Sequence, residues 1–317
     1  MIKRFNILVL KAEAKSLNHS LKNGAKNNVY GSWALITGST DGIGKSYANI
    51  LSRDYKLNLV LVSRNSEKLL KVKDELRKKN AKNLIIVITH DFEKDNIDDL
   101  MAKIEAETSG LDLRILVNNV GQLSGGPKFF ADRQNQEHID RLLKVNITSQ
   151  TRLTHYFMKR WEKSCSTKKS LCINLSSFSA LFPMPLMGIY PATKQFNKYL
   201  PQALNREQNG GSCEEKKDDC CGTSKKITFQ VIEPGYVCTG HHPIAKKPSL
   251  MIPTSDQLVT NCLNAVGHLD LTTGHFPTDL YASFVRFMAG NFLLKYVADF
   301  LVQKEMMKNL SEREKNE

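Results

Sequence analysis

The sequence predicts an α/β protein built on a doubly wound, mostly parallel sheet. From about residue 33 to about residue 233, apolar runs of strand length alternate with segments of helical period, which is the pattern of such a sheet. Several of the runs are rich in Val and Ile and lack polar alternation, as expected for strands that are buried on both faces. Because no linker interrupts the alternation, we expect a single domain with a C-terminal helical extension.

The predicted elements follow one another in a regular order. Six apolar runs are expected to be strands: Trp33–Thr37, Leu57–Val62, Leu84–Ile88, Ile115–Val117, Leu171–Leu175 and Ile227–Ile232. Five segments of helical period are expected to be helices: Gly44–Asp54, Glu67–Lys79, Ile97–Glu107, Glu137–Trp161 and Tyr190–Gln208. Residues 1–30 precede the alternation, and we expect them to form a flexible basic leader.

The first strand is followed by the turn Thr37-Gly38-Ser39-Thr40-Asp41-Gly42-Ile43-Gly44 and then by a helix. Glycines permit a tight turn, and they let backbone N–H groups and a helix amino terminus approach a pyrophosphate. The spacing G-x-x-x-G-x-G differs from the common G-x-G-x-x-G fingerprint. Its place between a strand and a helix nevertheless predicts a Rossmann-type dinucleotide site.

The second strand ends at Ser63-Arg64-Asn65, about twenty residues further on. An enzyme selective for NAD is expected to place an Asp or Glu here, to hold the ribose hydroxyls. Arg64 instead offers a cation to a 2′-phosphate. The sequence therefore predicts NADP(H) as the cofactor.

Two polar residues stand out in the second half of the alternation. Asn146 is a poor helix former inside the fourth predicted helix, which indicates either a kink with a bound water or a solvated residue. Ser177 directly follows the fifth predicted strand, so its hydroxyl is expected at the carboxyl end of the sheet, where such folds bind ligands. Ser176 and Ser179 are close alternatives.

Tyr190 and Lys194 stand four residues apart at the start of the fifth predicted helix, so both project from one face. Pro191 is tolerated there because the first turn of a helix needs no backbone donor. A neighbouring ammonium favours the phenolate and lowers the pKa of a tyrosine toward useful values. We therefore expect Tyr190 to transfer a proton, with the Ser177 hydroxyl holding a carbonyl oxygen.

Taken together, these residues resemble the short-chain dehydrogenase/reductase superfamily from Gly31 to about Gly240. The resemblance implies a catalytic tetrad, a cofactor turn, an acid at the adenine, a fourth-strand motif and a turn at the nicotinamide amide. The implied catalytic residues are Asn146, Ser177, Tyr190 and Lys194. The implied cofactor-binding residues are Gly38, Ser39, Thr40, Asp41, Gly42, Ile43, Gly44, Arg64, Asp91, Asn118, Tyr190, Lys194, Pro234, Val237 and Thr239.

Three stretches look like the 17-beta-hydroxysteroid dehydrogenase type 12 and type 3 group, which includes very-long-chain 3-oxoacyl-CoA reductases: residues 33–48, 118–121 and 183–185. The resemblance implies NADPH-dependent reduction of a lipid ketone on the cytoplasmic side of the endoplasmic reticulum. In the mechanism that the resemblance implies, hydride passes from the cofactor and Tyr190 gives the proton. Ser177 is expected to orient the oxygen, Lys194 to hold the ribose, and Asn146 to anchor a water. The group's hydrophobic amino-terminal anchor is missing, and residues 240–243 do not match it.

The net charge of the 317 residues is +13, with 45 Lys and Arg against 32 Asp and Glu. Residues 1–28 carry six of the basic residues and one Glu, so part of the excess lies in the leader and suits an anionic membrane surface. No segment interleaves aromatic and basic residues or has zinc-finger spacing, so no nucleic acid partner is expected. No window approaches the roughly 20 apolar residues of a spanning helix.

Three of the seven cysteines, Cys213, Cys220 and Cys221, gather in a polar stretch near residues 208–226. Their spacing contains no C-x-x-C pair, so we expect a surface loop insertion with free thiols and no metal site. Residues 31–275 would then form the Rossmann domain. Residues 276–317 would form an amphipathic helix, with a polar stripe between Leu280 and Gln303, and a charged tail.

The function that the resemblance implies is reduction of a long-chain 3-oxoacyl-CoA to the 3-hydroxyacyl-CoA of fatty-acid elongation. A ketosteroid substrate, a retinol or sugar-type substrate, and a catalytically silent NADP-binding scaffold stay open as alternatives. The amphipathic helix packs on the core, on a second subunit or on a membrane surface, so peripheral membrane contact and a homodimer are open as well.

Overall fold

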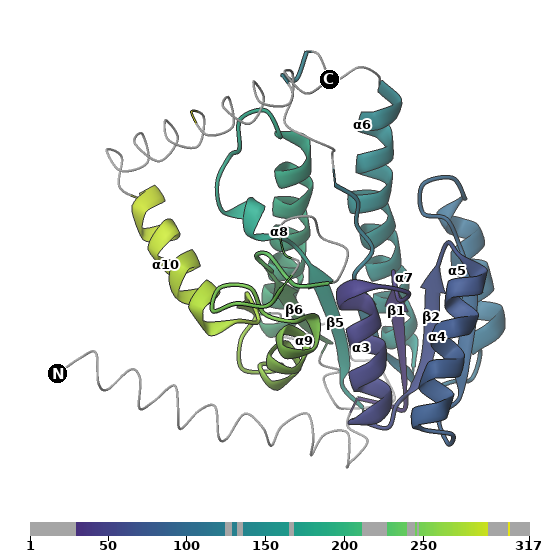
Figure 1. Ribbon diagram of the computed structural model, residues 1–317. Coiled ribbons are helices and arrows are strands. Elements are labelled where there is room, and N and C mark those ends of the chain that lie inside the picture. The colour runs from purple at the N-terminus through teal and green to yellow at the C-terminus, as the bar shows by residue number, and fades with distance from the viewer. Residues whose placement is uncertain are drawn as a thin grey trace.

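The computed structural model describes residues 30–123, 129–131, 136–164, 168–210, 227–239, 245, 247–290 and 304. Within them, seven parallel strands form one sheet in the order β3-β2-β1-β4-β5-β6-β7. The strands are β1 (Trp33–Thr37), β2 (Asn58–Ser63), β3 (Ile85–Thr89), β4 (Leu113–Asn118), β5 (Ser170–Leu175), β6 (Ile227–Ile232) and β7 (Leu271–Thr272). The predicted doubly wound sheet is confirmed (Figure 1).

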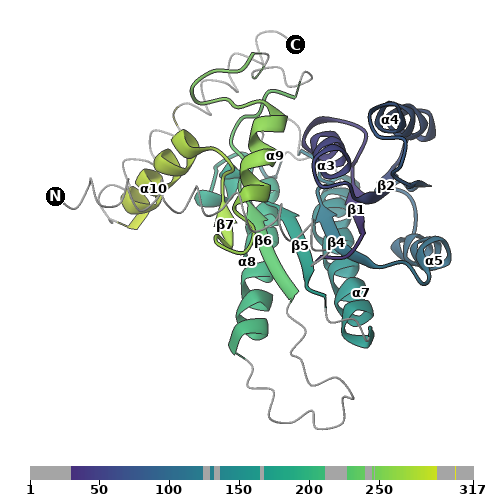
Figure 2. The ribbon, with the colours of Figure 1, turned by 90° about the horizontal axis from the view of Figure 1, so that it is seen from below.

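Helices cover both faces of the sheet. The α-helices are α3 (Gly42–Arg53), α4 (Ser66–Lys79), α5 (Ile97–Thr108), α6 (Gln136–Leu143), α7 (Ser149–Lys163), α8 (Ile189–Gly210), α9 (Ser255–Asn264) and α10 (Phe276–Gly290). In Figure 2, α3, α4 and α9 lie on one face, α5, α7 and α8 lie on the other, and α10 lies beyond the β7 edge. This layered arrangement is what strands buried on both faces require.

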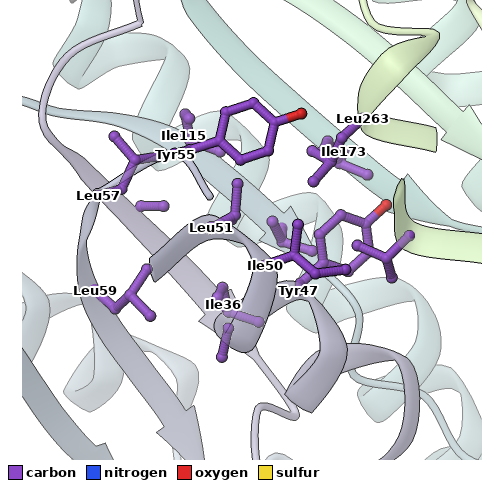
Figure 3. Packing of buried hydrophobic residues seen from close by; sticks show 14 of the residues in the cluster. Ile36, Tyr47, Ile50, Leu51, Tyr55, Leu57, Leu59, Ile115, Ile173 and Leu263 are labelled. Atoms are coloured by element: carbon purple, nitrogen blue, oxygen red, sulfur yellow. The ribbon is translucent and has the colours of Figure 1, made fainter. Parts of the chain in front are cut away.

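Successive residues of each strand point to opposite faces, and this sorts the buried side chains into two clusters among the described residues. In β1, Ala34 and Ile36 face the first cluster, whereas Trp33 and Leu35 face the second. Figure 3 shows the first cluster, in which α3 packs its apolar side onto β1, β2 and α9. The lack of alternation in the sequence thus has its cause in burial on both sides.

Polar residues fix the beginnings of the helices. The Asp41 side chain accepts a hydrogen bond from Gly42 N at 2.8 Å and caps α3. Asn65 caps α4 by accepting from Lys68 N at 2.8 Å. Such caps satisfy backbone donors that have no partner inside the helix. Both caps follow the carboxyl ends of strands, so they hold the helix amino ends at the same edge of the sheet.

The structure departs from the sequence prediction in four elements. The single helix expected over residues 137–161 is divided by the π-helical turn η1 (Lys144–Thr148), which separates α6 from α7. A 3-10 turn, η2 (Phe178–Leu181), follows β5. The elements α9 and β7 were not predicted. None of the helices in the described part of the chain is long and apolar enough to cross a membrane.

Several expectations lie outside the described residues. They concern the leader up to residue 29, the insertion over 211–226 with its three cysteines, residues 240–243, and the predicted helix beyond Gly290.

Candidate active site at the carboxyl ends of the strands

The sheet order creates a crevice between β1 and β4. The chain winds outward from β1 to β2 and β3, and then crosses back to β4 on the other side of β1. Ligands of open α/β sheets bind at such a switch point, outside the carboxyl ends of the strands. The glycine turn follows β1 at this edge, and Asn118 and Asn119 lie at the end of β4.

The glycine turn needs glycine at particular positions. Gly38 has a φ of +64°, a conformation that costs other residues energy. A Cβ on Gly44 would lie 2.2 Å from the Gly38 carbonyl oxygen, so no side chain fits there. This close approach of backbone to backbone brings the amino end of α3 to the crevice, where its dipole favours an anion.

Asn119 locks the turn to β4. Its side-chain amide donates hydrogen bonds to the carbonyl oxygens of Thr37 at 2.9 Å and Gly38 at 3.1 Å. The side chain of Asn118, which is predicted to contact the cofactor, is fully buried, and its amide donates to Thr154 Oγ1 at 2.9 Å and Asn174 Oδ1 at 3.0 Å. The side chain of Asn118 therefore faces α7 and the neighbouring strand β5. We assign the contact with the turn to Asn119.

A pocket of about 340 Å³ opens beside the turn. Its lining includes five of the predicted cofactor residues: Gly38, Thr40, Asp41, Arg64 and Asp91. Ser39 and Ile43, also predicted as cofactor contacts, are not part of the lining: Ser39 is fully buried, with Oγ 3.5 Å from the Val62 carbonyl oxygen, and Ile43 packs against the first cluster. The side chains of Ser39 and Ile43 therefore pack in the protein interior, and only their backbone atoms are part of the turn.

Arg64 is exposed at the rim of this pocket, at the end of β2. Its neighbours along the chain are Ser63, whose hydroxyl lies 3.0 Å from Thr40 Oγ1, and Asn65, which is used as a helix cap. No carboxylate stands at the end of β2 to meet a ribose 2′-hydroxyl. Since guanidinium groups pair well with phosphate, the rim suits a 2′-phosphate.

Ser177, Tyr190 and Lys194 come together on the other side of the crevice. Ser177 follows β5 and lies close enough to Tyr190, in the first turn of α8, to influence its pKa. Lys194 lies one turn further on, with Nζ 5.9 Å from the centre of the Tyr190 ring. The alternative Ser176 is buried and donates to the Lys194 carbonyl at 2.7 Å, while the Ser179 hydroxyl bonds to Ser177 Oγ at 3.0 Å. Ser177 is thus the serine that faces the tyrosine.

Burial dominates the ionisation of this group. It lowers the pKa of Lys194 to about 8, and it raises the pKa of Tyr190, which the nearby Ser177 hydroxyl partly lowers. A buried site disfavours the charged form of either residue. We expected Lys194 to lower the pKa of Tyr190, but burial has the larger effect and raises it. The Lys194 ammonium donates to the Leu175 carbonyl at 3.0 Å and lies over the ring.

Asn146 sits in the π-helical turn and is fully buried, so the alternative of a solvated residue is wrong. Its side chain exchanges two hydrogen bonds with the backbone of Gln122, at 2.8 and 3.0 Å, and donates to Thr193 Oγ1 at 3.1 Å. These bonds join the loop after β4 to α8. Gly121 lies in the same corner, because a Cβ on it would be 2.9 Å from Lys194 Nζ and 3.6 Å from Asn146 Oδ1. Neither Gln122 nor Thr193 is among the site residues predicted from the sequence.

The segment after β6 closes the crevice. The Pro234 carbonyl accepts from Phe178 N at 2.9 Å, next to Ser177. Thr239 lies against the glycine turn, since its Cγ2 would be 3.3 Å from a Cβ on Gly42. Val237 is buried in the first cluster and anchors the segment between them. Residues 234–239 therefore reach from the serine to the cofactor turn.

Comparison with known proteins gives consistent relationships. Residues 32–247 match the profile of the family described as short chain dehydrogenase. The chain is 37% identical over 251 residues to very-long-chain 3-oxoacyl-CoA reductase-A of Danio rerio, covering 78% of this chain and 70% of that protein. It is 34% identical over 269 residues to very-long-chain 3-oxoacyl-CoA reductase of Homo sapiens, covering 84% and 78%.

Solved structures are similar as well. A short-chain dehydrogenase from Sphingobium yanoikuyae in complex with NADPH gives a TM-score of 0.59 at 27% identity, covering 74% of this chain and 83% of that chain. The bulky-bulky ketone specific alcohol dehydrogenase from Comamonas testosteroni gives 0.58 at 29% identity, covering 74% and 82%.

Proposed function

Because the chain belongs to the short chain dehydrogenase family, we propose that it reduces a long-chain 3-oxoacyl-CoA to the 3-hydroxyacyl-CoA with NADPH. The observation that carries this proposal is the meeting of Ser177, Tyr190 and Lys194 with the glycine turn in one crevice. The similarity to very-long-chain 3-oxoacyl-CoA reductases supports the substrate class.

The residues present fit NADP(H). Gly38 and Gly44 let the turn close tightly on itself and on Asn119, which brings the amino end of α3 to where a pyrophosphate would bind, and Gly121 leaves room beside Lys194 where a Cβ would collide. The pocket of about 340 Å³ would receive the adenosine half, with Asp91 toward the adenine and Arg64 toward the 2′-phosphate. When bound, the cofactor supplies the hydride that adds to the ketone carbon.

The side chains divide the remaining work. Tyr190 Oη gives its proton to the ketone oxygen as charge develops there, and the Ser177 hydroxyl donates a hydrogen bond to the same oxygen. Burial keeps Tyr190 protonated, which is the form required of a proton donor. Lys194 would hold the ribose hydroxyls, and the bonds from Asn146 to Gln122 and Thr193 hold the corner in which a resupplying water would bind.

The decisive experiment is steady-state NADPH oxidation with 3-oxoacyl-CoA esters of increasing chain length and with 17-ketosteroids. We expect turnover of the acyl-CoA esters that rises with chain length and is lost in Tyr190→Phe. Faster turnover of a ketosteroid would favour that alternative substrate. Absence of turnover with every compound, while NADPH still binds, would favour a silent scaffold.

We also propose a peripheral contact with the cytoplasmic surface of the endoplasmic reticulum. On α10, Phe276, Leu280, Phe284 and Phe287 lie on one side of the helix and are 57–67% exposed. Such an exposed apolar face, together with a basic leader, suits an anionic lipid surface. In a flotation experiment, the wild-type chain should float with vesicles that contain anionic lipid, and the Phe284→Glu variant should stay in the bottom fraction.

We propose a homodimer as well, for which the exposed Phe196 and Tyr199 on α8 offer a surface. Light scattering, which gives the molar mass in solution, tests this.

A further inference from the structure

Glu233 is a fully buried carboxylate that the proposed chemistry does not use. It directly follows β6 and precedes Pro234, and its backbone N–H donates to the Thr272 carbonyl at 2.9 Å. Lys198 Nζ lies 2.7 Å from Glu233 Oε1, and Arg286 Nη2 pairs with Oε2. The carboxylate therefore joins the end of the sheet to two separate helices.

The pairing has a physical cause. A lone ionised carboxylate in a protein interior is strongly disfavoured, and removing one partner of a buried pair leaves an uncompensated charge. Glu233 has two such partners, because α8 brings Lys198 and α10 brings Arg286 to its carboxylate. The position of α10 is consequently coupled to the position of α8, in which Lys198 follows Lys194 by one turn.

The inner side of α10 touches both segments that carry the chemistry. The Tyr281 ring stacks on the Phe178 ring, with centroids 5.5 Å apart and planes 4° apart, and Phe178 follows Ser177. Thr278 Cγ2 would lie 3.2 Å from a Cβ on Gly235, in the segment after β6. Ala282, between these contacts, is fully buried. Phe178 and Tyr281 keep part of their area exposed, so their stack presents an open apolar edge next to the serine.

We propose that Glu233 is a positioning residue that docks α10, through Arg286, against the Ser177 segment, so that the Phe178–Tyr281 stack forms a wall for the acyl chain of the substrate. This role rests on the proposed function for the identity of the substrate. It predicts that weakening the pair harms long substrates selectively, because only their chains reach past the reacting carbonyl to the wall.

The experiment uses Arg286→Met, which removes the charge but keeps length, and Arg286→Lys, which keeps a cation. Arg152→Met is the matched control, since Arg152 pairs with Asp98 on the exposed surface of α7 and α5. We expect Arg286→Met to raise KM for 3-oxohexadecanoyl-CoA about tenfold, with kcat and the KM values for 3-oxobutanoyl-CoA and NADPH nearly unchanged. Arg286→Lys should recover part of the loss, and Arg152→Met should behave as wild type.

Amide hydrogen exchange supplies a readout that does not depend on activity. In Arg286→Met, and in Glu233→Gln if that variant folds, exchange should increase in residues 276–290 and 178–181 but not in α3 or α4. Unchanged exchange in these segments, or an equal rise in KM for short and long esters, would overturn the positioning role. If the wild-type protein reduces no 3-oxoacyl-CoA, the proposed function fails, and the exchange result still decides whether Glu233 docks α10.

Discussion

Lys194 Nζ lies 5.9 Å from the centre of the Tyr190 ring, on the face of α8 that meets the end of β5. The ammonium is buried and bonded to the Leu175 carbonyl, so it approaches the tyrosine over its ring. This geometry accounts for the direction of both pKa shifts, because desolvation acts on the two groups before any cofactor or substrate is bound.

Tyr190→Phe should remove the proton donor and leave the fold intact. Phenylalanine keeps the ring that lies under Lys194 and loses only the hydroxyl, so we expect kcat to fall by about 10²- to 10⁴-fold with NADPH affinity retained. Tyr199→Phe, on an exposed position of the same helix, is the control. Retained wild-type turnover in Tyr190→Phe would refute the assigned role.

Lys194→Met should inactivate the enzyme and stabilise the fold at neutral pH. Burial lowers the pKa of Lys194 to about 8, from 10.5 in the unfolded chain. Between these two values the unfolded state holds the proton that the folded state has released, so wild-type stability rises with pH there. At pH 7 the buried charge costs up to about 3 kcal/mol.

The cost of burying the Lys194 charge is tested by measuring the free energy of unfolding of the wild type and of Lys194→Met between pH 7 and pH 10. The advantage of Lys194→Met should be largest at pH 7 and shrink as the pH rises above 8. A difference that stays constant over this range would show that the charge of Lys194 is not the cause.

Gly121→Ala should impair turnover more than stability. The added Cβ would come 2.9 Å from Lys194 Nζ, and the end of a lysine side chain moves aside at low cost. We expect kcat to fall about tenfold or more, since catalytic groups misplaced by 1 Å lose much of their effect, with little change in melting temperature. Gly188→Ala, whose Cβ meets nothing within 4 Å, should remain close to wild type.

Arg64→Ala should lower the preference for NADPH. A charge-assisted contact with the 2′-phosphate contributes roughly 1.5–3 kcal/mol, so KM for NADPH should rise about 10- to 100-fold while KM for NADH stays unchanged. Arg77→Ala, which removes an equal charge from the last turn of α4, serves as the control. An equal rise in KM for NADPH and NADH would contradict this role of Arg64 and would indicate that the substitution had disturbed the glycine turn.

The sequence was sufficient for the six longer strands because five of them are almost entirely buried, which imposes apolar runs on them, and the partly buried edge strand β3 carries the apolar run Ile85–Ile88 as well. It was insufficient for β7, whose two residues, Leu271 and Thr272, carry no pattern. Helix α9 does carry a sequence signal at its start. Thr254 and Gln257 cap each other's backbone there, and the pattern T-x-x-Q is typical of the beginning of a helix.

In the site, the pairing of Tyr190 with Lys194 follows from helical spacing alone, and the structure places the two accordingly. The direction of the Asn118 side chain could not be predicted, because its partners Thr154 and Asn174 are brought to it only by the packing of α7 and β5. The role of Glu233 could not be foreseen, since Arg286, 53 residues away, meets it only through the tertiary fold.

The π-helical turn at Lys144–Thr148 makes this part of the chain sensitive to length as well as to composition. A π-turn accommodates one more residue than an α-helical turn, so deleting a single residue there would let α6 and α7 merge into one regular helix. The outer faces of α6 and α7 would stay nearly in register, because the π-turn is what absorbs the extra residue, but the backbone of the turn would be drawn in and its side chains redirected. Asn146 would then lose its alignment with Gln122 and Thr193 although every side chain of the site was still encoded.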